Sequence, residues 1–104
     1  MQTIRVGQLP PEPLDAARAF HAQIPTPTAE NLTLIFAPAD HTHRAWRAVA
    51  IQSLARQSAP ARVNAIASDH EPAIASAIAY LSAAPGVTGQ LLELDGTGAG
   101  EVLS

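Results

Sequence analysis

The chain has 104 residues and a formal net charge of −3, with 47% hydrophobic and 14% charged residues, which fits one small folded domain and is too apolar for a disordered tail. It contains no cysteine and no lysine, since all six basic residues are arginines, and this excludes disulfides, thiolate zinc sites and lysine chemistry. No apolar run reaches the roughly 18 residues that span a bilayer. Residues 1–5 also lack the layout of a signal peptide, and the few basic residues offer little to a phosphate backbone, so we expect a cytoplasmic protein that binds neither membrane nor nucleic acid.

The first third of the chain predicts a strand, a helix and a second strand. Residues 3–6 form a short strand candidate, and the prolines that follow suit the entrance of a helix over residues 13–23. Pro25 stops this helix. Residues 32–36 are a nearly continuous apolar run, which is typical of a buried strand in a parallel sheet.

The longest predicted helix follows. Asp40 or Thr42 can cap it, and it continues to about Gln57 before Pro60 forbids further extension. Apolar side chains surround most of its circumference, so we expect it to be covered on two sides. Beyond it the pattern predicts a strand over residues 62–67, a third helix that begins at Glu71 and ends before Pro85, and a last strand over residues 90–94.

This alternation predicts the α/β class, with a small two-layer or three-layer parallel sheet of four strands and three crossover helices. One domain is expected over residues 1–96, followed by a flexible tail over residues 97–104. If the strands lie side by side in sequence order, right-handed crossovers should place the helices predominantly on one face. The opposite face would then be bare and would recruit a cover.

Several short motifs occur in order along the later part of the chain. They are SLAR at residues 53–56, AP at 59–60, RVNAIA at 62–67, AYL at 79–81, VTGQ at 87–90 and LDG at 94–96. In this order they resemble the later half of the short-chain dehydrogenases/reductases, over roughly residues 32–96. The resemblance implies half of a Rossmann-like fold, and its first two helices would form the subunit interface.

The chain also departs from that family where its chemistry resides. No glycine-rich turn for a dinucleotide precedes the first strand, and the alignment puts Asp40 and Arg44 where the resemblance would require the catalytic tyrosine and lysine. Neither can replace the original, because an aspartate lacks the phenol and an arginine lacks the compact ammonium. Because of these departures we expect no catalytic residue and no cofactor. We also expect no metal, because an aspartate and two close histidines make an incomplete ligand shell for structural zinc.

The densest polar cluster is Asp40, His41, His43 and Arg44. It could supply ligands to a metal or a metabolite at the carboxyl end of the second strand, where open α/β sheets bind their ligands. The simpler interpretation is a capped helix start with exposed imidazoles and a surface ion pair between Asp40 and Arg44.

Two functional hypotheses follow. The first is a non-catalytic association module that forms a homodimer or docks on a full-length dehydrogenase or another larger enzyme to stabilise or regulate it, with an interface formed by Phe20, Trp46, Val49 and Ser53. The second is a small metabolite binder or minor enzyme that uses the cluster from Asp40 to Arg44.

Overall fold

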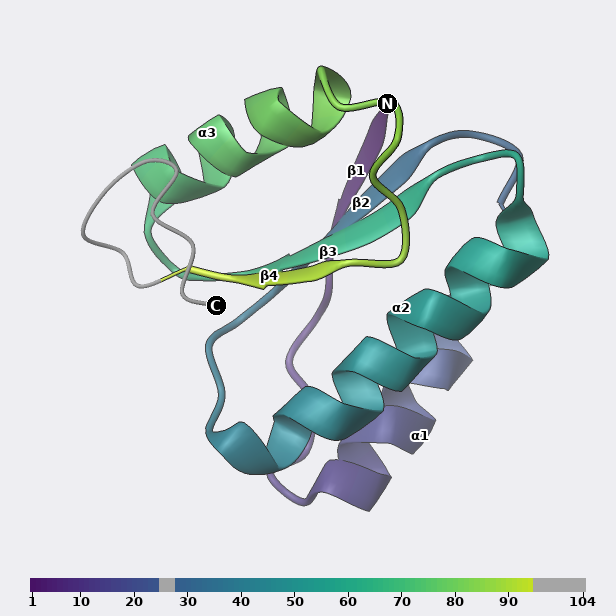
Figure 1. The fold of residues 1–104 in the computed structure, drawn as a ribbon. Helices are drawn as coiled ribbons and strands as arrows, with labels where there is room; N and C mark the ends of the chain where they lie inside the picture. The colour runs from purple at the N-terminus through teal and green to yellow at the C-terminus, as the bar shows by residue number, and fades with distance from the viewer. Residues whose placement is uncertain (25–27, 95–104) are drawn as a thin grey trace.

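The computed structural model describes residues 1–24 and 28–94. Its elements, in chain order, are β1 (Gln2–Arg5), α1 (Pro13–Gln23), β2 (Leu32–Phe36), the short 3-10 turn η1 (His41–His43), α2 (Arg44–Ser58), β3 (Val63–Ala67), α3 (Glu71–Ser82) and β4 (Leu91–Glu93). The four strands form one parallel sheet in the order β1-β2-β3-β4 (Figure 1). The predicted α/β class is therefore confirmed, with each element within a few residues of its expected place.

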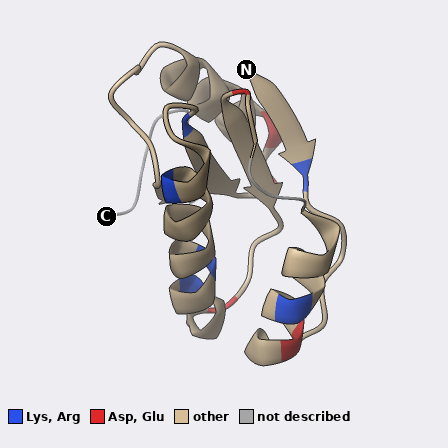
Figure 2. Ribbon diagram, turned by 90° about the vertical axis from the view of Figure 1, so that its right-hand side faces the viewer, with Lys and Arg blue, Asp and Glu red and all other residues tan. Residues whose placement is uncertain are grey.

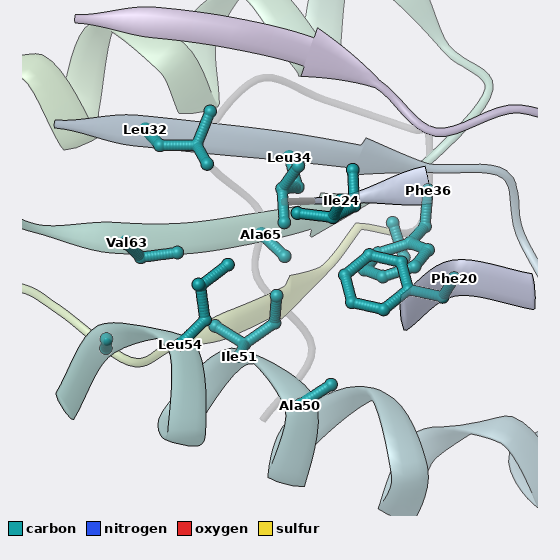
Figure 3. Packing of buried hydrophobic residues seen from close by; sticks show 12 residues of the cluster. Phe20, Ile24, Leu32, Leu34, Phe36, Ala50, Ile51, Leu54, Val63 and Ala65 are labelled. Carbon is teal, nitrogen blue, oxygen red and sulfur yellow. The ribbon is translucent and has the colours of Figure 1, made fainter. Parts of the chain in front are cut away.

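The two central strands explain why their sequences are almost entirely apolar. Every residue of β2 and β3 is buried, and Leu32 pairs with Val63 at the start of their register. Side chains alternate between the two faces of a strand, so each face receives an apolar set. Leu34 and Ala65 point toward Ile51 and Leu54 of α2 (Figure 3).

The helices lie on both faces of the sheet. Helices α1 and α2 pack on one face, where Phe20, Ile51 and Leu54 meet the sheet (Figure 1). Helix α3 lies on the opposite face, where Ile74 and Leu81 join the second core cluster. The sheet is thus the middle one of three layers.

The expectation that one face would be bare is therefore wrong. The strand order continues in the same direction through all three connections, but α3 crosses on the other face. The β3–α3–β4 connection consequently has the opposite hand to the first two, against the strong preference for right-handed crossovers. Because Ile35 and Ile66 alternate onto that face, they need the apolar cover that α3 supplies.

Hydrogen bonds join the motif at residues 62–67 to the motif at residues 87–90. Asn64 is buried in β3, and its side chain donates to the carbonyl of Val87 and accepts from the backbone N–H of Gln90. Gly89 has a φ of 75° and donates its N–H to the carbonyl of Val63 at 2.7 Å. A positive φ strains any side chain with a Cβ, so glycine is required at this turn. Arg62 donates to the carbonyls of Leu81 and Ala84 at the end of α3, which fixes that helix to the sheet.

The predicted boundary of the domain at residue 96 and the predicted tail over residues 97–104 lie outside the described residues, which end at residue 94. Within the described ranges, no helix has both the length and the apolar character needed to cross a membrane.

Candidate functional site

A pocket of about 440 Å³ opens at the carboxyl ends of β1 and β2. Its walls come from the loop over residues 6–11, which follows β1, and from Phe36 at the end of β2 together with residues 37–39, which follow it. Helix α2 contributes Arg47, and η1 contributes His43. Both loops must leave the sheet at the same edge because the strands are parallel, and this edge is where open α/β sheets bind ligands.

Arg47 is the buried charge of this pocket. The residue is only 5% exposed, and its Nη1 donates to the carbonyl of Ala37 at 3.0 Å. Its Nε has no hydrogen-bond partner among residues 1–24 and 28–94. The guanidinium carbon lies 4.4 Å from the centre of the Phe36 ring, a cation–π contact. Burial lowers the pKa of Arg47 because it penalises the charged form, while the negative charge of Glu93 acts in the opposite direction.

His43 is held from both sides of its ring. The indole Nε1 of Trp46 can only donate, so Nδ1 of His43 accepts its hydrogen bond at 2.9 Å. Nε2 then carries the proton and donates to the carbonyl of Pro11 at 3.0 Å. His43 is therefore a neutral bridge between α2 and the β1 loop, and both of its nitrogens are occupied.

Three aromatic rings pack together beside this bridge. Phe20 of α1, Phe36 of β2 and Trp46 of α2 have ring centroids 5.4 to 5.8 Å apart. Phe20 is 1% exposed, so its placement at a protein interface is corrected: it belongs to the core between α1, α2 and the sheet (Figure 3). Trp46 is half-buried, and its indole N–H is bound to His43, so it also takes part in the internal packing of the chain.

The other two predicted interface residues remain accessible. Val49 is 62% exposed on the outer side of α2, and Ser53 is half-buried one turn further along. Ser53 lines a small groove of about 140 Å³ between α1 and α2, together with His21 and Gln57. These residues lie on the side of α2 that is turned away from the sheet.

The side chains of the predicted polar cluster, Asp40 to Arg44, do not meet at one site but contact different partners. Asp40 accepts hydrogen bonds from the hydroxyl and the backbone N–H of Thr42, which lower the pKa of its carboxyl and confirm its capping role. Arg44 pairs with Glu93 at the end of β4 through a 2.6 Å contact, and not with Asp40. His41 is exposed. The described residues contain no group of three or more histidine, aspartate or glutamate side chains that could hold a metal ion.

The described residues do not fit a dinucleotide. Binding of its pyrophosphate requires a glycine-rich turn whose N–H groups point at the phosphates from a helix start. The turn from β1 to α1 instead holds Pro10, Pro11 and Pro13, which lack N–H groups, and a single glycine, Gly7. A Cβ at Gly7 would meet only the side chain of Gln23, at 3.5 Å, so this glycine does not maintain a close backbone approach.

Sequence reasoning missed Arg47 as a site residue. A signal was present, because Arg47 precedes Ile51, Leu54 and Ser58 by four, seven and eleven residues, which puts it on the sheet-facing side of the helix. An arginine at a buried helical position is rare unless it is paired.

The amino-acid sequence also matches a protein-family model. Residues 4–94 match the family described as short chain dehydrogenase-like protein. Neither the curated proteins nor the solved structures contain a significant match. The matched segment runs from β1 to the end of β4 and includes both motifs that hydrogen-bond across the sheet edge.

Proposed function

Since the chain belongs to the short-chain dehydrogenase-like family, we propose that it is a non-catalytic member that functions by association through the outer surface of α1 and α2. The partner is a second copy of the chain or a full-length dehydrogenase, which it stabilises or regulates. The observation that carries this proposal is the exposure of large aliphatic side chains on this surface: Val49 of α2 is 62% exposed and Leu14 of α1 is 65% exposed.

The charge distribution of α2 supports association through this surface. The helix contains no acidic residue, and between Arg44 and Arg56 its only charge is the buried Arg47 (Figure 2). Its exposed middle therefore presents uncharged side chains around Val49, and depletion of charge is what distinguishes the centre of a protein interface from its rim. Small residues such as Ala45 and Ala48 would let a partner helix approach closely.

The contacts of the two residues that align with the family's catalytic tyrosine and lysine support the absence of catalysis. Asp40, at the position aligned with a catalytic tyrosine, caps η1, and Arg44, at the position aligned with a lysine, pairs with Glu93. A bare sheet face no longer supports association, because α3 covers it.

Self-association is tested by measuring the molar mass of the chain with light scattering during size-exclusion chromatography. We expect a dimer for the natural chain and a monomer for Val49→Asp, because a buried carboxylate would oppose the contact. Tyr80→Asp is the matched control, since Tyr80 is 55% exposed on α3, across the sheet, and its replacement should leave the dimer intact. Circular dichroism must show that both variants are folded.

Docking on a larger enzyme is tested by affinity capture from native lysate, with quantitative mass spectrometry. Support requires that a full-length short-chain dehydrogenase is enriched with the natural chain, lost with Val49→Asp and retained with Tyr80→Asp. A natural chain that is monomeric at all concentrations and captures no such dehydrogenase would contradict the proposal. An equal loss of association in Val49→Asp and Tyr80→Asp would contradict a contact through the outer surface of α1 and α2.

A further inference from the structure

Within the described part of the chain, no carboxylate contacts the positive charge of Arg47. Among residues 1–24 and 28–94, ion pairs join Arg5 to Glu71 and Arg44 to Glu93, and neither includes Arg47. Glu93 influences Arg47 electrostatically, but its carboxylate is bound by Arg44. The structure thus leaves a guanidinium at the wall of the pocket with one neutral acceptor, the carbonyl of Ala37.

A buried guanidinium with a single neutral acceptor lowers the stability of the fold unless a further interaction compensates its charge. A buried charge needs pairing and full hydrogen bonding, and a buried donor without a partner costs about 1 to 3 kcal/mol. The cation–π contact with Phe36 offsets only part of this cost. Because Arg47 lines the pocket, an anion bound there would compensate the charge of its guanidinium, although its Nε is itself enclosed by the described part of the chain.

We propose that this pocket binds a small organic carboxylic acid, with its carboxylate against the guanidinium of Arg47 and its apolar body against the loop walls. Guanidinium and carboxylate match in geometry, because two N–H groups can donate to two oxygens. The volume of about 440 Å³ lies within the range of small-molecule sites.

The lining favours a carboxylate with an apolar body over phosphate. Val6, Leu9 and Pro38 line the pocket, and they offer contacts to an alkyl chain but no further charge. His43 is neutral, and both of its nitrogens are already hydrogen-bonded within the chain. One cation suits a monoanion, whereas a phosphate dianion would keep an uncompensated charge in a partly apolar site.

This inference does not rest on the association proposed above. The pocket is built from the loops after β1 and β2, whereas Val49 lies on the outer side of α2. The monomer expected for Val49→Asp should therefore bind the acid with unchanged affinity, and the two proposals can fail separately.

The first test compares three probes on the natural chain by NMR titration of backbone amides. We expect n-butyrate to give saturable shifts at Gly7, Ala37 and Ala39, with a dissociation constant tighter than about 1 mM. Butyramide, which has the same shape without the charge, should bind about tenfold more weakly or worse. Equal binding of butyrate and butyramide, tighter binding of inorganic phosphate, or no saturation by butyrate would overturn the proposal.

The second test removes the guanidinium. Arg47→Gln should weaken butyrate binding about tenfold or more, while Arg44→Gln, which removes the arginine paired with Glu93, should leave it within a factor of about two. Retained affinity in Arg47→Gln would overturn the proposal. If Arg47→Gln does not fold, the comparison of butyrate with butyramide on the natural chain is by itself the test of carboxylate binding.

Discussion

The indole Nε1 of Trp46 donates a 2.9 Å hydrogen bond to Nδ1 of His43, three residues earlier on the same helical segment. Nε2 of His43 in turn donates a hydrogen bond to the carbonyl of Pro11 in the loop that follows β1. The only tryptophan of the chain therefore fixes the ring that ties α2 to one wall of the pocket. This hydrogen bond gives Trp46 a role in the internal structure in addition to the interface role that the sequence suggested.

Trp46→Phe should lower the free energy of unfolding by about 1 to 2 kcal/mol, because it removes the donor and leaves Nδ1 of His43 without a partner. Trp46→Ala should cost about 3 kcal/mol or more, since it also removes the ring from the cluster with Phe20 and Phe36. Urea unfolding followed by circular dichroism measures both values. An unchanged midpoint for Trp46→Phe would show that the hydrogen bond does not contribute to stability.

Arg47→Met should leave the free energy of unfolding unchanged or raise it by about 1 kcal/mol. The substitution replaces a buried, incompletely paired charge with an apolar side chain of similar length, and such replacements are often neutral or stabilising. Its butyrate affinity should be lost at the same time, which is the trade-off expected of a binding residue. A loss of more than about 2 kcal/mol would instead mark Arg47 as a structural residue.

Asp40→Asn should destabilise the chain at neutral pH but not in acid. Hydrogen bonds from the hydroxyl and backbone N–H of Thr42 hold the pKa of Asp40 below its ordinary value of 3.8. Its contribution to stability is therefore complete above that ordinary value and is lost as the pH falls through the depressed pKa. Thermal unfolding should show a gap between natural chain and variant at pH 7 that closes toward pH 2.

The control for this experiment is Asp69→Asn, because the side chain of Asp69 makes no hydrogen bond or ion pair with the described part of the chain. It should show no comparable gap at pH 7. A gap for Asp40→Asn that persists in acid would exclude the carboxylate charge as its cause.

Local sequence signals predicted the elements well. The helix at Pro13–Gln23 and the strand at Leu32–Phe36 have the expected bounds, since proline and the apolar run act over short distances. Which face α3 covers could not be predicted in this way. It depends on the hand of a crossover, and the general rule favours the hand that this connection does not have.

The edge of the sheet at which the polar cluster lies could be predicted from the sequence, but the partners of its side chains could not. Asp40 marked the correct edge of the sheet, but the pairing of Arg44 with Glu93 joins residues 49 apart and depends on where β4 lies. The expected Asp40–Arg44 pair is local, and the structure replaces it with this distant one. The pocket itself forms between two loops, so its volume and the burial of Arg47 exist only after the sheet is assembled.

Association through α1 and α2 is tested most directly by distances between copies. The chain has no cysteine, so Val49→Cys and Tyr80→Cys each introduce one site for a spin label. Pulsed dipolar spectroscopy should give a defined distance between labels at position 49 that is shorter than the distance between labels at position 80, across the sheet. A shorter distance at position 80, or no dipolar signal at either position, would contradict self-association through this surface.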